Sequence, residues 1–396
     1  SVDLMIRAAL IKLSEQEHVL QIVIHHIAAD GWSIGVLTQE LGELYKAYSN
    51  GQQTPLLSLP VQYVDFSEWQ RQQLTESAIS AQLSYWENQL SGAPQLLEIP
   101  TDYPRTPQRT NQGTQLSFSV PQAIAGYLKA LGQANGATLF MTLLAVFNVL
   151  LYRYSGQTDI MVGSPIANRP RKELESLIGL FLNTLVLRTD LSDDPSFTRL
   201  LERVKQTSLG AYAHQDVPFE QLLETLKPER DLSYSPWFQV LFILQNTPQL
   251  TQQLTDLSIQ TEHIEKTTAK FDLTLSMRES ADGLKGTLEY STELFNADTI
   301  ARMIGHFQVV LHASAHSPDT PISALPLLTP AEKEQILTSW NHPQINATEF
   351  NITESTHEPV CIHHLFEDQV KKTPEAIAHT HQNQSLTYQQ LNDQAN

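Results

Sequence analysis

The chain has 396 residues, of which 41% are hydrophobic and 17% charged, as expected of a globular protein with more than one domain. A formal net charge of −18 disfavours binding to nucleic acid or to anionic membranes. One cysteine, Cys361, excludes an internal disulfide framework, and no signal peptide opens the chain, so we expect a cytoplasmic protein. The apolar run 139–154 carries polar interruptions and predicts a buried core helix, not a membrane span.

The first hundred residues begin with an apolar segment rich in Val and Ile. Residues 19–26 predict a buried strand. Apolar residues then recur at helical spacing from Ile34, with Ser33 as the expected N-cap. The next predicted elements are helices over 64–74 and 79–90, followed by an irregular proline-rich crossing over 91–113.

The rest of the chain interleaves strands and helices. The predicted strands are 114–120, 159–166, 181–188, 238–244, 271–277 and 285–291, and the predicted helices are 121–133, 138–154 and 298–315, the last with Asp298 as N-cap. This order predicts an α/β fold, and the short turn between the last two strands predicts a hairpin, so the sheet is not purely parallel. From residue 318 to residue 362 the composition turns to scattered Pro, Thr, Asn and Glu, which predicts a linker before a new segment at His363. With the motifs quoted below, we expect units over 1–100 and 101–325, a linker over 326–362 and a new unit over 363–396.

The segment HHIAADGWSIG, residues 25–35, joins the first strand to the following helix and carries the candidate chemistry. Adjacent residues on a strand point to opposite faces, so His25 and His26 are not expected to ligate one metal ion, and Asp30 alone would not complete a site. We therefore predict no metal site. An ordinary turn with two structural histidines stays open as the simplest interpretation.

Gly31 to Gly35 also match the Gly-x-Ser-x-Gly pattern of a serine nucleophile elbow. The predicted strand ends four residues too early for such an elbow, and capping of the helix is sufficient reason for Ser33. A serine hydrolase that uses Ser33 remains a less favoured alternative.

A third interpretation uses His26 directly. Asp30 can fix the loop, Gly31 allows a close approach of the backbone, and the following helix N-terminus supplies free N–H groups. This set suits acyl transfer, in which an imidazole handles a proton and N–H groups stabilise an oxyanion. Spacing alone is weak evidence, because His-His-x-x-x-Asp recurs over 363–368 in a predicted helix.

Further segments decide between these interpretations. With HHIAADGWS they occur in the order YVDFSEWQ (63–70), IGLFLNTLVLR (178–188), HQDVPFE (214–220) and RDLSYSPWFQVLF (230–242). The set resembles the ordered motifs of the condensation domains of nonribosomal peptide synthetases, over residues 1–325. The segment from His363 to the last residue is similar to the beginning of an adenylation domain.

The resemblance implies a two-lobed, V-shaped fold similar to chloramphenicol acetyltransferase, with residues 1–100 from the first lobe and 101–325 forming the second. It implies peptide-bond formation between thioesters carried on 4'-phosphopantetheine arms of upstream and downstream carrier domains, with an adenylation domain in cis. His26 takes the catalytic role, His25 and Asp30 support it, and Gly31 allows close approach or donates from its backbone.

The resemblance also sets expectations about completeness and subtype. Most of the first lobe is absent, including the arginine expected to pair with Asp30, so we expect this chain by itself to be inactive. The intact histidines argue against a heterocyclization relative, and Trp32 before Ser33 against an epimerization relative. The segment SYSPWFQVLF, residues 233–242, is most similar to the subtype that joins an L-configured donor to an L-configured acceptor. A non-catalytic, condensation-like docking domain stays open.

Other candidate residues follow from the same motifs. Asn183 and Thr184, with Ser33, are candidates for substrate binding, and Arg188 shares their predicted strand. The basic cluster NRPRK, residues 168–172, is a candidate carrier-docking loop, although a solvated loop is the simpler interpretation.

Overall fold

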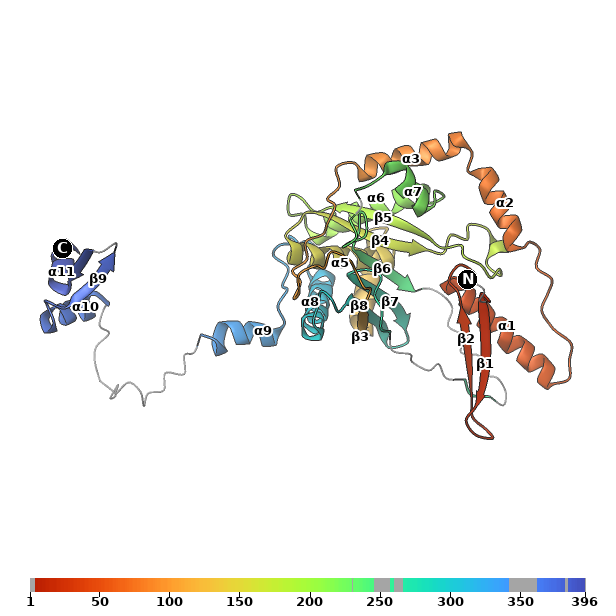
Figure 1. Ribbon diagram of the computed structural model, residues 1–396, viewed down its shortest axis with the longest axis horizontal. Coiled ribbons are helices and arrows are strands. Elements are labelled where there is room, and N and C mark those ends of the chain that lie inside the picture. Colours follow the sequence, from red (N-terminus) through yellow and green to blue (C-terminus); the bar gives the residue numbers. More distant parts are fainter. Residues whose placement is uncertain are drawn as a thin grey trace. The chain divides into compact units, whose positions relative to one another are not determined.

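A six-stranded mixed sheet organises most of the chain (Figure 1). The computed structural model describes residues 4–229, 231–245, 257–259, 266–341, 362–381 and 384–395. Within it, the chain divides into one unit over Ser1–Lys333 and a second over Glu334–Asn396. Arg230 and Cys361 lie outside the described residues.

The sheet has the strand order β3-β8-β7-β6-β4-β5. These strands are β3 (Gly113–Pro121), β4 (Asp159–Ile166), β5 (Asn183–Asp190), β6 (Val240–Gln245), β7 (Leu273–Ser280) and β8 (Gly283–Ser291). β6 runs parallel to both of its neighbours and the other pairs are antiparallel, including the predicted β7–β8 hairpin. The prediction that the sheet is not purely parallel is therefore confirmed.

Helices pack on this sheet and on one another to form the main core. They are α4 (Gln122–Ala134), α5 (Leu139–Ser155), α6 (Phe197–Ala213) and α8 (Ala297–His316). α5 begins at the Thr138 cap and ends at Gly156, whose left-handed φ of 71° stops the helix. All of its residues from Met141 to Leu151 are buried, which explains its nearly unbroken apolar sequence.

Further helices precede the sheet or lie between its strands. α1 spans Gly31–Ser49, α2 Tyr63–Gln73, α3 Glu76–Leu90 and, further along, α7 Phe219–Leu226. A 3₁₀ turn covers Lys172–Leu174 between β4 and β5. Phe66 on α2 packs with Leu174, Leu177 and Phe181 in a second, smaller apolar cluster.

The first strand differs from its prediction. β1 (Ile6–Lys12) and β2 (His18–Ile24) form a two-stranded antiparallel sheet whose side chains are mostly exposed, so the expectation of a buried strand is wrong. β2 also ends at Ile24, so His25 and His26 follow the strand rather than alternate along it. A high content of Val and Ile predicts extended backbone, but it does not predict whether another part of the protein covers the strand.

Two predicted helix caps are also wrong. α8 has Asn296 as its N-cap, and Asp298 lies in the first turn, where its carboxylate is still near the positive end of the helix dipole. α1 begins at Gly31 with Asp30 as N-cap, three residues earlier than expected from Ser33. In both cases the apolar periodicity locates the helix but not its first residue.

The end of the chain contains helical and strand segments. α9 covers Pro330–Glu334 and a π-helical turn Gln335–Ser339, within the stretch predicted as linker. In the second unit, α10 (Ile362–Lys372) and α11 (Tyr388–Ala395) accompany the β9 (Ile377–His381) and β10 (Gln384–Thr387) pair. The second His-His-x-x-x-Asp thus lies in a helix, as predicted. The boundaries over 1–100, 101–325 and 326–362 remain predictions.

Among the described residues, no single helix is long and apolar enough to cross a bilayer, and α4 with α5 reaches the necessary length only as a pair bent by 106°.

The packing of the main core predicts a large cost for truncation at Phe242, which is fully buried on β6 and contacts Phe140 and Phe147. Phe242→Ala should lower the free energy of unfolding by about 3–5 kcal/mol because it leaves a cavity. Urea denaturation would measure this loss. Tyr127→Ala, at an exposed position on α4, is the control. An equal effect of the two substitutions would contradict the assignment of the core.

Candidate functional site

The turn after β2 presents the two histidines in different ways. The N–H of His25 donates to the carbonyl of Met5 (2.8 Å), which extends the strand pairing by one residue. His25 Nδ1 then accepts from the Ile27 N–H (3.1 Å), and its carbonyl accepts from the Ala28 N–H (2.9 Å). His25 therefore shapes the turn, and His26 lies exposed within it.

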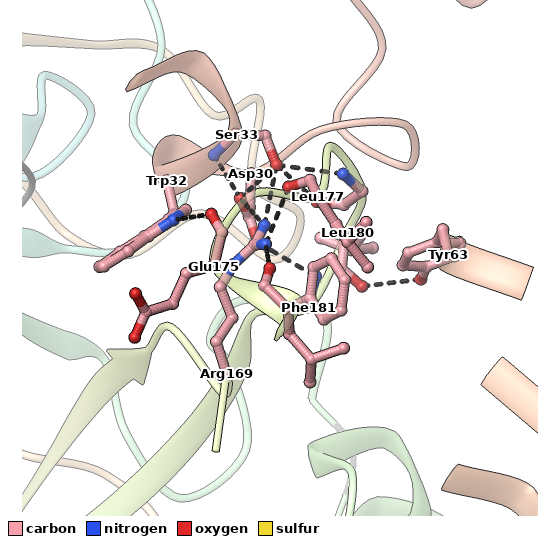
Figure 2. Close-up of polar contacts among 11 residues, drawn as sticks. Asp30, Trp32, Ser33, Tyr63, Arg169, Glu175, Leu177, Leu180 and Phe181 are labelled. Carbon is pink, nitrogen blue, oxygen red and sulfur yellow. Dashed lines mark hydrogen bonds and ion pairs between the residues drawn. The ribbon is translucent and has the colours of Figure 1, made fainter. Parts of the chain in front are cut away.

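Asp30 closes the turn and caps the next helix. Its side chain is buried and accepts from the Ser33 N–H (2.8 Å) and from the Phe181 N–H (3.1 Å). The Asp30 N–H donates in return to the Gly179 carbonyl (3.2 Å). One carboxylate thus holds the start of α1 and the segment before β5 together (Figure 2).

Ser33 is fully buried and belongs to the same network. Its Oγ lies 2.7 Å from Asp30 Oδ1 and 2.9 Å from the Gly179 carbonyl, and it accepts from the Gly179 N–H (3.1 Å). The prediction that Ser33 is the N-cap is therefore wrong, because Ser33 lies inside the first turn of α1 with its hydroxyl engaged. The same burial disfavours the alternative of an exposed elbow nucleophile. Ser33 also offers no exposed atom to a substrate.

The cation that pairs with Asp30 is Arg169. Its Nη2 lies 3.3 Å from Asp30 Oδ1, and both side chains are 2% exposed. Nη2 also donates to Ser33 Oγ (3.0 Å). The expectation that the partner arginine is absent from this chain is therefore wrong.

Arg169 is positioned by backbone carbonyls and by an aromatic ring. Nη1 donates to the carbonyls of Leu174 and Leu177, and the guanidinium carbon lies 3.9 Å from the centroid of the Phe181 ring. The NRPRK cluster is consequently divided: Arg169 is buried, while Arg171 is exposed and lies over the Trp69 ring at 4.8 Å. Arg169 is therefore not available to dock a carrier domain, and a docking role would be limited to the exposed residues of the cluster.

A topological signal identifies Arg169 in principle. The end of β4 pairs with the beginning of β5, Ile166 opposite Asn183. Residues just after β4 and just before β5 therefore lie at the same edge of the sheet. Both strands are predicted from the sequence. Arg169 follows β4 and is therefore expected next to the segment that precedes β5.

The electrostatics of the site favour an ionised Asp30. Burial raises the pKa of this carboxyl, but the hydrogen bonds from Ser33 and Phe181 and the Arg169 guanidinium outweigh it and hold the pKa below its ordinary 3.8. Asp30 is therefore a structural anion and does not act as a proton donor near neutral pH.

Asn183 and Thr184 lie at the beginning of β5. The Asn183 amide donates to the carbonyls of Gln215 and Val217 (both 2.8 Å) and accepts from the N–H groups of Thr184 (2.8 Å) and Phe219 (3.0 Å). All four of its hydrogen-bonding positions are occupied, so Asn183 fastens the HQDVPFE loop rather than facing a substrate.

Its neighbours Thr184 and Arg188 differ from it in burial and in partners. Thr184 is half-buried opposite Pro165. Arg188 forms an ion pair with Asp159 (2.7 Å). Pro218 is the N-cap of α7.

Within the part of the chain that the structure describes, no group of three or more His, Cys, Asp or Glu side chains is arranged to hold a metal ion.

The fold and this site define the class of protein. The family model of the condensation domain matches residues 1–337, so the chain belongs to the condensation-domain family. Similar structures support the mixed α/β fold that the sequence predicted. The X-domain from teicoplanin biosynthesis is 30% identical with a TM-score of 0.75, covering 83% of this chain and 76% of that one.

Its sequence relatives are much longer synthetases. Malpibaldin synthetase of Mortierella alpina is 44% identical over 391 residues, covering 99% of this chain and 7% of that protein. Dimodular nonribosomal peptide synthase of Bacillus subtilis (strain 168) is 38% identical over 401 residues, covering 98% of this chain and 16% of that protein. The chain thus spans less than a fifth of the length of these two relatives.

Removal of Arg169 should be strongly destabilising, because it leaves the Asp30 carboxylate buried without its counter-ion. Arg169→Ala is expected to lower the free energy of unfolding by about 3–5 kcal/mol. Arg171→Ala, two residues away and exposed, should cost less than about 1 kcal/mol. Urea denaturation of both variants makes the comparison. Equal losses would show that Arg169 is a surface residue.

The lowered pKa of Asp30 predicts how its contribution varies with pH. The ionised carboxylate stabilises the folded state above pH 3.8, and this contribution is lost as the pH falls through the lower folded pKa. The stability difference between the wild type and Asp30→Asn should therefore be largest near pH ~6 and shrink toward pH ~3. Asp282→Asn, at an exposed carboxyl in the turn between β7 and β8, is the control. A difference that grows in acid would contradict the account.

Proposed function

We propose that the chain catalyses amide-bond formation between two thioester-bound acyl groups, as part of a multidomain synthetase. One observation supports this most: the exposed His26 lies in a turn whose other motif residues, His25 and Asp30, are committed to holding it in place. Both imidazoles are exposed, but His25 Nδ1 is engaged by the Ile27 N–H, which leaves His26 as the candidate for the chemistry, five residues before α1 begins.

In the proposed reaction, the α-amine of the acceptor attacks the thioester carbonyl of the donor. A C–N bond forms, the C–S bond breaks, and the donor thiol leaves with the proton that the nitrogen loses. His26 positions the amine or relays that proton. The first N–H groups of α1, at Gly31 and Trp32, have no partner within the helix and can stabilise negative charge on the carbonyl oxygen.

The acyl groups are proposed to arrive on 4'-phosphopantetheine arms of upstream and downstream carrier domains. The exposure of His26 fits a substrate delivered on a flexible arm. An adenylation domain in cis would begin within 363–396, where α10, β9, β10 and α11 form a small unit. The L-donor, L-acceptor subtype and the cytoplasmic location remain predictions from the sequence.

A docking domain without chemistry is the second candidate. It is favoured by the similarity to the teicoplanin X-domain, which has also been solved in complex with OxyB. Retention of His25, His26 and Asp30 in an ordered turn supports the catalytic alternative. The serine hydrolase alternative loses its support because Ser33 is fully buried.

Substitution of His26 distinguishes the candidates. In the full-length synthetase with both carriers loaded, His26→Ala should lower formation of the lengthened acyl-carrier by at least about 100-fold, as loss of a positioned imidazole does. Mass spectrometry of the acceptor carrier measures the product.

The chain supplies a matched control in His364→Ala, the second histidine of the helical His-His-x-x-x-Asp in α10. This variant should form product at the wild-type rate. Product formation by His26→Ala at the wild-type rate would remove His26 from the mechanism. No product from any form, including the wild type, would favour the docking domain.

A further inference from the structure

Tyr63, the first residue of α2, contacts the segment that encloses Asp30. Its hydroxyl donates to the Leu180 carbonyl (2.8 Å), and its ring meets the Phe181 ring edge to face at 5.1 Å between centroids (Figure 2). A Cβ built on Gly179 would lie 2.2 Å from the Tyr63 ring, so the backbone passes directly against that ring. Tyr63 thus touches three consecutive residues.

Two of these residues, Gly179 and Phe181, supply much of the hydrogen bonding to Asp30 and Ser33. The Phe181 N–H donates to Asp30, and the Gly179 carbonyl accepts from the Asp30 N–H. Gly179 also engages Ser33 through both of its backbone groups. The segment lies before β5 and outside the strand pairing, so the sheet does not fix its position.

Tyr63 itself is well anchored. At the beginning of α2, the N–H of the Gln62 N-cap donates to Asp65 Oδ2 (2.7 Å). Phe66, one turn later, packs against Phe181 at 4.6 Å between ring centroids. The pKa of Tyr63 is raised by burial and by the neighbouring Asp30 charge, so its hydroxyl remains protonated and able to donate.

We infer that Tyr63 is a positioning residue for the proposed reaction, acting through Gly179–Phe181 on Asp30 and hence on the turn that carries His26. The inference rests on the proposed function. It assigns Tyr63 no contact with substrate. Its hydrogen bond to the Leu180 carbonyl fixes the position of the Phe181 N–H, and this N–H in turn fixes the position of the Asp30 carboxylate.

Tyr63→Phe tests the inference, because it keeps the ring and removes only the hydroxyl. In the full-length synthetase, kcat should fall about three- to tenfold, the effect of one lost hydrogen bond on a positioned group, while KM for either loaded carrier stays within about twofold. The same variant should show faster amide hydrogen exchange at Phe181.

The matched control is Tyr154→Phe. The Tyr154 hydroxyl also makes a hydrogen bond, to His306 (2.7 Å), between α5 and α8 and away from the site. This variant should lose comparable thermal stability while kcat and Phe181 exchange stay at wild-type values.

The outcomes separate this inference from the proposed function. An unchanged kcat in Tyr63→Phe, or a loss equal to that in Tyr154→Phe, overturns the positioning role. If the wild type forms no product, the proposed function fails, and Phe181 exchange still decides whether Tyr63 holds the segment. If the Phe181 amide exchanges at the same rate in the wild type, Tyr63→Phe and Tyr154→Phe, Tyr63 does not hold the segment in place.

Discussion

The buried ion pair between Asp30 and Arg169 is the constraint on which the site depends. Both side chains are almost fully excluded from water, so each must be paired and hydrogen-bonded to be stable there. Asp30 receives donors from Ser33 and Phe181, and Arg169 donates to two backbone carbonyls. The pair therefore joins the start of α1 to the segments that follow β4 and precede β5.

This arrangement separates the residues that shape the turn from the residue proposed to act on the substrate. Asp30 and Ser33 are buried and fully engaged, and His25 is exposed but uses its ring nitrogen and backbone to shape the turn. His26 is exposed next to them. The motif thus exposes two imidazoles, of which the His25 ring shapes the turn through its Nδ1, and the other motif residues determine where His26 lies.

Periodicity predicted the elements of the sheet and its helical layer well, because α5 and the strands are buried and their apolar residues follow the local geometry. Periodicity failed where contacts with distant parts of the chain determine the burial of a residue or the first residue of a helix. The exposure of β2 depends on what covers it, and the cap of α1 depends on Asp30 accepting the Ser33 N–H. Arg169 stands in a basic cluster that predicts a solvated loop, and its burial arises from partners far away in sequence, at the neighbouring ends of β4 and β5.

A double-mutant cycle between Asp30 and Arg169 tests the central claim most directly. The free energies of unfolding of the wild type, Asp30→Asn, Arg169→Met and the double variant would be measured by urea denaturation near neutral pH. The account predicts a coupling energy above about 1.5 kcal/mol, with the double variant more stable than the sum of the single losses requires. Additive losses, with a coupling energy near zero, would contradict it.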